Sequence, residues 1–263
     1  MAGTILLETK NLSKRFGGLK ALDRFDFLVR HGEIVGLIGP NGSGKTTFFH
    51  VVTGILKAAS GTVMFGERRE VLTALPPHRI TALGIARTFQ RQRLFNQMTV
   101  LQNVLVGAHC RTCSGLFGSI LRTPATRREQ KVVQEKATRL LALFGERLLP
   151  RAQDPAWTLS YANRRRLEIA RALAADPLLL LLDEPAAGMN PTETRELMRD
   201  ILSIREQGIT IVLIEHDMTV VRGICDQVVA LDHGIKIAEG SFEEVRNHPS
   251  VIEAYLGRRA KHA

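Results

Sequence analysis

Length, composition and charge describe a globular protein with a substantial core. The chain has 263 residues, of which 44% are hydrophobic and 24% charged, and this size is near the upper limit for one domain. Three cysteines are too few for a disulfide framework, and no apolar run approaches the ~20 residues of a membrane-spanning helix. The composition therefore excludes a disulfide scaffold and an integral membrane protein. Since the first residues also lack the apolar stretch of a signal peptide, we expect a cytoplasmic protein.

The balance of charges favours an anionic partner. Lys and Arg number 36 against 26 Asp and Glu, which gives a net charge of +10. Such a charge suits a nucleotide, an acidic lipid surface or a nucleic acid, and it equally suits helix faces that are merely solvated. The densest basic clusters are Arg164-Arg165-Arg166 and the stretch 258–262. We expect most of these charges to be solvated.

The first part of the chain has the pattern of β-strands. Residues 6–12 and 25–29 predict strands of an antiparallel edge, and residues 62–66 predict a further short strand. The apolar run 34–38 predicts a buried strand. Because helical patterns alternate with strands further along the chain, the whole predicts an α/β core.

A glycine-rich segment follows the buried strand 34–38 directly. It fits the pattern G-x-x-x-x-G-K-[ST], in which glycines let successive backbone N–H groups point at phosphates and the next helix adds its dipole. We expect Lys45 to place its charge on the β- and γ-phosphates and Thr46 to offer its hydroxyl to Mg²⁺. The alternative, a turn that only joins strand to helix, does not require the complete pattern. The predicted nucleotide-binding residues are Gly39, Pro40, Asn41, Gly42, Ser43, Gly44, Lys45, Thr46 and Thr47.

From about residue 91 the pattern becomes helical. Apolar residues recur among charges in 131–144, as in an amphipathic helix, whereas 111–126 has no clear period and is expected to be the least ordered part. The predicted organisation is a single domain with a core at 1–90 and 166–240, a helical subdomain at 91–165 and a C-terminal tail at 241–263.

Two cysteines in the helical region invite a metal or redox interpretation. Cys110 and Cys113 have the spacing of a thioredoxin-like motif or of half a zinc site. No second cysteine pair or neighbouring His doublet completes a tetrahedral site, so we interpret the spacing as coincidental.

Two acids follow a buried strand in the second half of the chain. A helix predicted at 164–174 leads to the apolar strand 178–182, which ends in Asp183 and Glu184. A hydrophobic strand followed by an acid has the form of a Walker-B element. We expect Asp183 to support Mg²⁺, usually through water, and Glu184 to orient and deprotonate the attacking water. A charged turn that closes a buried strand is the alternative.

A histidine follows the next buried strand. Residues 209–214 predict this strand, and Glu215-His216-Asp217 come after it. Ligands of α/β sheets bind at the carboxyl ends of the strands. An isolated histidine is more often structural or exposed, but this position predicts that His216 reaches a γ-phosphate and the attacking water.

A five-residue segment carries the most specific resemblance. Leu159-Ser160-Tyr161-Ala162-Asn163 opens the helix before the Walker-B strand, and together with the phosphate loop it makes the chain resemble an ABC-type ATPase. The resemblance implies an α/β P-loop NTPase core of the ABC ATPase type, with an antiparallel β edge and an inserted helical subdomain. It also implies ATP hydrolysis with Mg²⁺ at the interface of a head-to-tail dimer.

The resemblance assigns roles to further residues. Phe16 would stack on adenine, although by spacing alone it could belong to the core. Gln90 would hold Mg²⁺ and sense the helical lobe. In the dimer, Ser160, Tyr161 and Ala162 would complete the ATP site of the opposite subunit.

Finer features narrow the resemblance to one group of importers. The stretches 14–18, 86–90, 184–188 and 251–257 are similar to those of the ATPases of branched-chain amino-acid importers. Importers of urea or short-chain amides are built alike, and they stay open as an alternative. Loop 187–190 is expected to cross the dimer interface.

The family also implies partners and a location. We expect transmembrane permease subunits, contacted by Gln90 and residues 91–99, and a second ABC ATPase that is either a paralogue or an identical copy. A substrate-binding protein would act indirectly, and no nucleic acid is expected. The chain would lie in the cytoplasm, peripheral on the inner face of the cell membrane.

A soluble ABC ATPase that acts on nucleic acid or ribosomes is the alternative function. Such proteins usually have a second cassette or a long coiled coil, and this sequence shows neither. A P-loop kinase fits less well, because the signature segment would then be unexplained.

The signature departs from the usual pattern of the family. Ala162 and Asn163 stand where glycine and glutamine are usual. Glycine permits unusual dihedral angles and a close approach to phosphate, whereas alanine adds a Cβ. We therefore expect Ala162 to weaken phosphate binding without abolishing it.

Overall fold

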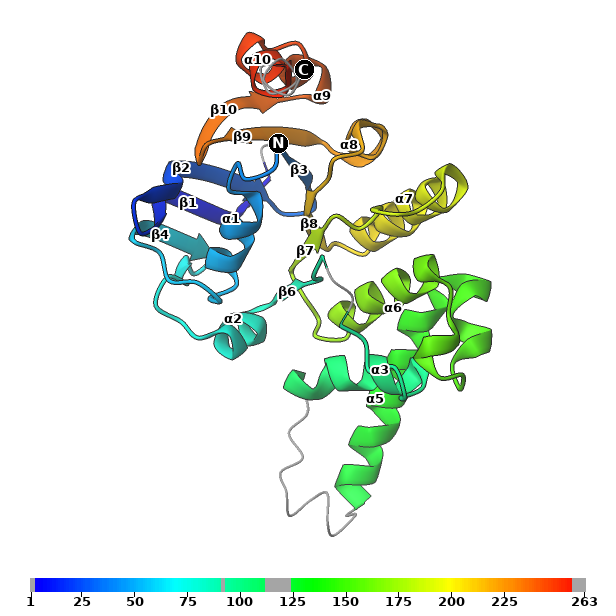
Figure 1. Cartoon of the computed structure of the whole chain (residues 1–263). Helices are drawn as coiled ribbons and strands as arrows, with labels where there is room; N and C mark the ends of the chain where they lie inside the picture. The colour runs from blue at the N-terminus through cyan, green and yellow to red at the C-terminus, as the bar shows by residue number, and fades with distance from the viewer. Residues whose placement is uncertain (1–2, 91–92, 112–123, 257–263) are drawn as a thin grey trace.

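The protein consists of two β-sheets with helices packed around them. The computed structural model describes residues 3–90, 93–111 and 124–256. One sheet has four strands in the order β2-β1-β4-β5, and the other has six in the order β10-β9-β3-β8-β7-β6. In Figure 1 the four-stranded sheet lies on one side of the six-stranded sheet and helices α3, α5 and α6 lie on the other. This arrangement confirms the predicted α/β fold with an antiparallel edge.

The four-stranded sheet is entirely antiparallel. Its first two strands pair as a hairpin, with Phe16 opposite Leu19 across the turn Gly17-Gly18. Cross-strand pairing continues beyond the apolar residues, so both strands are longer than the predicted 6–12 and 25–29. The strands of this sheet are β1 (Ile5–Phe16), β2 (Leu19–Arg30), β4 (Ser60–Phe65) and β5 (Glu70–Val71).

The six-stranded sheet carries the nucleotide-binding segments at one edge. All of its adjacent pairs are parallel except β10 with β9, which is antiparallel. Parallel strands have their carboxyl ends at the same edge, so the segments that follow β3, β7 and β8 come together there. The strands are β3 (Ile34–Ile38), β6 (Ile85–Arg87), β7 (Leu179–Asp183), β8 (Thr210–Ile214), β9 (Gln227–Asp232) and β10 (Ile235–Gly240).

The central strands separate two hydrophobic cores. Every residue of β3, β7 and β8 is buried, and successive side chains point to opposite faces. Leu179 and Leu181 pack with the antiparallel sheet and α1. Leu180 and Leu182 pack with the helices on the other face. A strand covered on both faces explains why these segments are continuous apolar runs.

Most of the helices lie on the face of the six-stranded sheet that is opposite the antiparallel sheet. Among the residues that the structure describes, no helix is long and apolar enough to cross a membrane. The segments 112–123 and 257–263 lie outside the described residues, as does Cys113, so the predictions made for them stay predictions. The helices are α1 (Lys45–Val52), α2 (Pro77–Leu83), α3 (Val100–Gly107), α5 (Pro124–Ala142), α6 (Tyr161–Leu173), α7 (Pro191–Glu206), α8 (Met218–Ile224), α9 (Phe242–Arg246) and α10 (Pro249–Leu256), with short 3-10 turns at Ala108–Arg111, Gly145–Arg147, Leu149–Arg151 and Ala156–Thr158.

Helix α6 begins earlier than predicted. Ser160 is its N-cap, and the Ser160 hydroxyl accepts a hydrogen bond from the backbone N–H of Asn163. The boundary predicted at residue 165 between helical subdomain and core therefore falls inside α6. The other predicted boundaries stay predictions.

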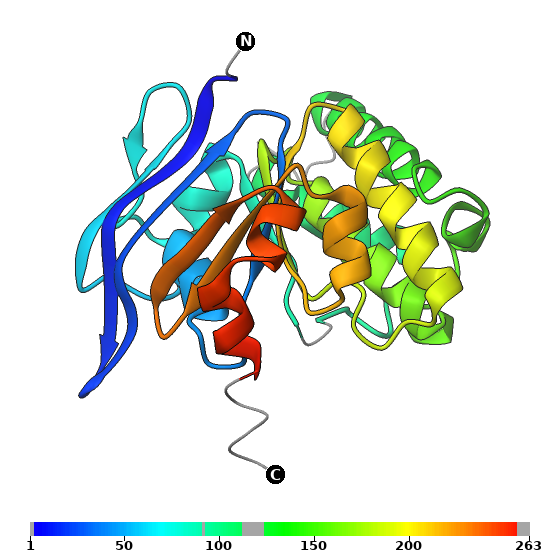
Figure 2. The same ribbon diagram turned by 90° about the horizontal axis from the view of Figure 1, so that it is seen from above.

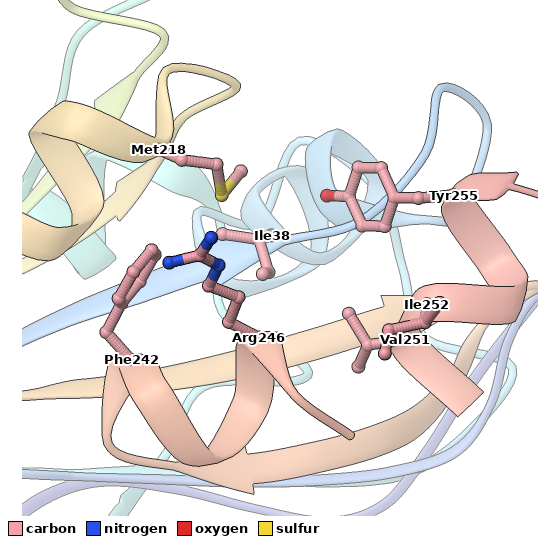
Figure 3. Close-up of a pocket in the computed structure, with 7 residues that line it drawn as sticks. All are labelled: Ile38, Met218, Phe242, Arg246, Val251, Ile252 and Tyr255. Carbon is pink, nitrogen blue, oxygen red and sulfur yellow. The ribbon is translucent and has the colours of Figure 1, made fainter. Parts of the chain in front are cut away.

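The last two helices fold back over the end of the six-stranded sheet. Figure 2 shows α9 and α10 beside β9 and β10. Together with Ile38 and Met218 they surround a largely apolar cavity of about 300 Å³, into which the Tyr255 ring projects (Figure 3). The C-terminal tail thus packs next to the residue that precedes the phosphate loop.

Candidate nucleotide-binding and catalytic site

Two glycines allow the phosphate loop to take its shape. Gly39 has φ +148° and Gly44 has φ +113°, values that residues with a side chain rarely adopt. A Cβ at Gly39 would lie 2.0 Å from the carbonyl oxygen of Leu231, and one at Gly44 would lie 2.3 Å from that of Ala21. The loop therefore requires glycine at both positions.

Lys45 is held inside the loop. Its Nζ donates to the carbonyl oxygens of Gly39 and Pro40 at 2.8 and 2.9 Å and lies 3.4 Å from Ser43 Oγ. The residue is only 5% exposed, at the start of α1. The loop thus places a cation beside the backbone N–H groups of a helix N-terminus, an arrangement that suits an anionic ligand.

The predicted residues meet around one cavity. It has a volume of about 480 Å³ and lies at the carboxyl edge of the six-stranded sheet. Phe16 is 47% exposed there, so it does not belong to the core. Lys20 and His233 also line the cavity, although the sequence did not predict them. The lining residues are Phe16, Leu19, Lys20, Ala21, Asn41, Gly42, Ser43, Gly44, Lys45, Thr46, Thr47, Gln90, Glu184, His216 and His233.

Glu184 stands between two polar side chains. Gln90 Nε2 donates to Glu184 Oε2 at 3.0 Å, and His216 Nε2 lies 3.1 Å from Glu184 Oε1. The three residues follow β6, β7 and β8, which are adjacent in the sheet. Each carboxylate oxygen of Glu184 thus has a polar partner that orients it. In this arrangement His216 contacts Glu184, the residue that was predicted to act on water.

Asp183 lies below this surface and is paired with an arginine. It is 1% exposed, and its Oδ2 accepts from Arg87 Nη2 at 2.8 Å. The other oxygen, Oδ1, is buried and has no hydrogen-bond partner among the described residues. Burial lowers the pKa of Arg87, and the ion pair with Asp183 opposes that shift. One oxygen of Asp183 is therefore neutralised and the other is left for a ligand or a water.

A buried acid supports the loop that contains Glu184. Glu215 Oε1 accepts from the N–H of Ala186 at 2.7 Å, and Oε2 accepts from the N–H of His216 at 3.1 Å. Burial raises the pKa of the Glu215 carboxyl, while its backbone hydrogen bonds act in the opposite direction. Glu215 thus joins the segments that carry Glu184 and His216.

The signature residues do not line this cavity. Ser160 caps α6, and the Tyr161 side chain is 48% exposed. The Tyr161 ring lies beside Gly188, where a Cβ would be 3.3 Å from it. The signature and the predicted interface loop 187–190 are therefore neighbours on the surface.

Ala162 does not take a backbone conformation that favours glycine. Ala162 lies in the first turn of α6, has no unusual backbone angle and is only 2% exposed. Its backbone is therefore unstrained, because alanine favours the helical conformation. Its Cβ is buried and does not project from the surface. The predicted effect of Ala162 on phosphate binding stays a prediction.

Sequence reasoning missed some of the site because turns and buried charges give little signal. His233 lies in the turn between β9 and β10, and the N–H of Gly234 in the same turn donates to the carbonyl of Ser43 at 2.8 Å. The parallel pairing of β9 with β3 could have placed this turn at the edge of the site. The expectation that Arg164-Arg165-Arg166 is solvated is wrong for two members, because Arg165 is 0% and Arg166 is 1% exposed.

Comparisons with known proteins agree with this geometry. The family model for the ABC transporter matches residues 22–187, and that for the branched-chain amino acid ATP-binding cassette transporter matches residues 236–261. The high-affinity branched-chain amino acid transport ATP-binding protein LivG of Salmonella typhimurium is 47% identical over 253 residues, which cover 96% of this chain and 98% of LivG. BraF of Pseudomonas aeruginosa, which has the same description, is 41% identical, again covering 96% and 98%.

A solved structure shows the same fold. The crystal structure of the ADP conformation of an ATP-binding cassette from an ABC transporter has a TM-score of 0.83 and 34% identity, covering 97% of this chain and 99% of that chain. The ABC ATPase fold and the ATPase activity predicted from the sequence are thereby confirmed, and the named relatives agree with the main interpretation rather than with its alternatives. The chain belongs to the family of ABC transporter ATP-binding proteins.

Proposed function

We propose that the chain hydrolyses ATP to energise the import of branched-chain amino acids. The observation that carries the proposal is the position of Glu184, which faces the phosphate-loop cavity with Gln90 and His216 on its two oxygens. The substrate class is supported by the names of LivG and BraF and by the C-terminal family match.

The arrangement suits in-line attack of water on a γ-phosphate. Lys45 would neutralise charge on the phosphates, and the phosphate loop would hold them through backbone N–H groups. Glu184 would accept the proton of the attacking water, since its carboxylate faces the cavity. Gln90 and His216 fix the orientation of that carboxylate, and His216 would stabilise the γ-phosphate. Catalysis would then consist mainly of positioning and electrostatic stabilisation.

The residues present fit a magnesium ion. Thr46 and Gln90 line the cavity, and the buried Oδ1 of Asp183 has no hydrogen-bond partner among the described residues. Hydroxyl, amide and carboxylate oxygens are the ligands that Mg²⁺ prefers. Thr46 and Gln90 would hold the ion, with Asp183 acting through water. When bound, Mg²⁺ would supply positive charge that neutralises the phosphates.

The signature would serve a second subunit. Ser160 and Tyr161 are exposed and do not line the cavity of their own chain, so they would complete the site of another cassette in a head-to-tail dimer. That cassette would be a paralogue or an identical copy.

An exposed apolar surface would contact the permease. Phe95, Met98 and Trp157 are 47%, 38% and 59% exposed. Their segments are joined, because the N–H of Trp157 donates to Asn96 O at 3.2 Å. Exposed apolar clusters of this kind mark protein contacts. The chain would thus lie at the inner face of the membrane, bound to transmembrane subunits and acting only indirectly with a substrate-binding protein.

Two substitutions test the catalytic proposal. Lys45→Ala should abolish most ATP binding, whereas Glu184→Gln should keep ATP binding and reduce phosphate release by at least about 100-fold, because the general base is lost. Lys131→Ala is the matched control, since the Lys131 side chain is 79% exposed on α5. Undiminished turnover by Glu184→Gln in the assembled transporter would exclude Glu184 as the base.

A further inference from the structure

The helix that begins at the signature sends a buried arginine to the backbone of the catalytic segments. Arg165 lies on α6, and its side chain is 0% exposed. A buried guanidinium needs several acceptors, because an unpaired buried charge is costly. Its acceptors therefore show what it holds in place.

These acceptors are carbonyl oxygens on both sides of the Gln90–Glu184 contact. Arg165 Nη1 donates to Phe89 O at 2.7 Å, and Nη2 donates to Gln90 O at 3.1 Å. The same Nη2 lies 3.4 Å from Glu184 O. One guanidinium thus joins the backbones of the two residues whose side chains meet at 3.0 Å.

A buried acid fixes the orientation of the guanidinium. Glu168 Oε2 accepts from Arg165 Nη1 at 3.0 Å, and its Oε1 accepts from the N–H of Arg93 at 2.9 Å. Burial raises the pKa of Glu168, and the hydrogen bond from Arg93 and the charge of Arg165 oppose the shift. The Arg165–Glu168 pair therefore contacts the chain at residues 89, 90 and 93, on both sides of the undescribed residues 91–92.

Glu184 needs such support because its backbone is strained. Its φ is +48°, in the left-handed region that residues other than glycine rarely occupy. Strained residues at functional sites persist when their surroundings fix them. Besides Arg165, the N–H of Ala187 donates to Glu184 O at 3.2 Å, and the N–H of Glu184 donates to Ile214 O at 2.9 Å.

We propose that Arg165 is a positioning residue that holds the backbones of Gln90 and Glu184 so that the Glu184 carboxylate is correctly oriented for hydrolysis. The inference rests on the proposed role of Glu184. The planar fork of arginine reaches several carbonyls at once, whereas a lysine ammonium acts as a point charge. Arg165→Lys should therefore keep the charge opposite Glu168 but lose the simultaneous contacts.

The next residue provides a matched control. Arg166 is 1% exposed on the same helix and pairs with Asp200 and Glu196 of α7. It also donates to Asn163 Oδ1 at 3.2 Å, and within the described part of the chain it has no hydrogen bond to Gln90 or Glu184. Arg166→Lys and Arg165→Lys therefore both remove a buried guanidinium, and the two variants differ in the groups that the guanidinium contacts.

The experiment compares both variants in the full transporter, with kcat, KM for ATP, nucleotide binding and thermal unfolding measured for each. Arg165→Lys should lower kcat about 10-fold or more, with KM changed less than about threefold, because misplacement of a base reduces the rate without removing phosphate contacts. Arg166→Lys should keep kcat within about threefold. If Arg165→Lys fails to assemble, Arg165→Gln retains an amide donor and should show the same split between kcat and KM.

A double-mutant cycle adds a readout that a purely structural role would not move. In a Gln90→Ala background the effect of Arg165→Lys on kcat should be smaller, because the Gln90–Glu184 side-chain contact that Arg165 supports through both backbones is already absent. Equal kcat losses in Arg165→Lys and Arg166→Lys, or an unchanged kcat in Arg165→Lys, would overturn the positioning role. An inactive wild-type transporter would instead contradict the proposed function.

Discussion

Gln90 and Glu184 are 94 residues apart in the chain, and their side chains form a hydrogen bond of 3.0 Å. The bond joins the segment after β6 to the segment after β7, which pairs with it in parallel. A residue that could respond to the helical lobe is thus in direct contact with the proposed base. If Gln90 senses the helical lobe, as the family resemblance implies, this contact would link nucleotide occupancy to the position of the lobe.

Gln90→Ala should reduce hydrolysis more than it reduces ATP binding. Loss of the amide leaves Glu184 Oε2 without its partner, and we expect kcat to fall about tenfold through poorer orientation of the base. Gln134→Ala, at an exposed position of α5, is the control. Measurement of kcat and of nucleotide affinity in the same preparation separates the two effects. A variant with wild-type kcat would show that the contact is dispensable.

The Arg87–Asp183 pair should be important for stability. Arg87→Leu would leave a carboxylate that is 1% exposed without its partner, which typically costs about 3–5 kcal/mol of unfolding free energy. Chemical denaturation measures this loss. Lys131→Ala breaks an exposed pair with Glu135 and should cost less than about 0.5 kcal/mol. A loss below about 1 kcal/mol in Arg87→Leu would show that the buried ion pair is not important for stability.

Ala162→Gly should destabilise the protein and should not increase the rate of ATP hydrolysis. Glycine in a helix costs about 0.5–1 kcal/mol relative to alanine, and Ala162 lies in α6 with ordinary helical angles and 2% exposure. This outcome is opposite to that expected from the sequence, where the signature was compared with a glycine pattern. Thermal unfolding and ATP turnover of the assembled transporter test it. A faster Ala162→Gly variant would show that the Cβ hinders a nucleotide-bound dimer.

The sequence was informative where chemistry depends on local spacing. The phosphate loop needs glycine at fixed positions, and Gly39 and Gly44 show why, since a Cβ at either would meet a backbone carbonyl. Glu184 and His216 were also predictable, because each follows a strand that is buried on both faces and parallel strands end at the same edge. For Glu184 and His216, the position directly after a buried parallel strand predicts that their side chains lie close together.

The sequence was uninformative where a contact depends on tertiary packing. Arg165 belongs to a run of arginines that composition alone assigns to solvent, yet the backbone carbonyls that it contacts lie 19 to 76 residues away. Asp183 was predicted to support Mg²⁺, and nothing in the local pattern indicates that Arg87 occupies one of its oxygens. The helical conformation of Ala162 was not foreseen, because the start of the helix was predicted at residue 164 and not at Ser160. Long-range partners of buried charges are not encoded in periodicity.

Cys225 should be unreactive in the folded protein. Burial, with smaller contributions from Asp226 and Glu215, raises the pKa of its thiol to about 12. At pH 8 only about 1 thiol in 10⁴ is then ionised, and the thiolate is the form that reacts. Peptide mapping after iodoacetamide treatment should show slow alkylation of Cys225 that increases about tenfold per pH unit while the fold persists. The same peptide should react rapidly in urea, and equal rates in both states would contradict the partial burial of the thiol.

The surface formed by Phe95, Met98 and Trp157 should lie against a permease subunit. Single cysteines at Phe95 and Trp157, in a chain whose three native cysteines are replaced, should crosslink to a cytosolic segment of the permease. Ile235→Cys is a suitable control, because Ile235 is a comparably exposed apolar residue, at 50%, and lies on β10, far from α3 in Figure 1. If membrane contact depended only on exposed apolar area, all three positions would crosslink alike. If coupling passes through the segment next to Gln90, only the cysteines at positions 95 and 157 will crosslink. Their crosslinking yield should also differ between the nucleotide-free and the ATP-bound Glu184→Gln transporter, because the side chain of Gln90 contacts residue 184. A further single cysteine at Ile252, which is 44% exposed on α10, tests the C-terminal tail. Crosslinks from that position alone would place the coupling surface on the tail instead.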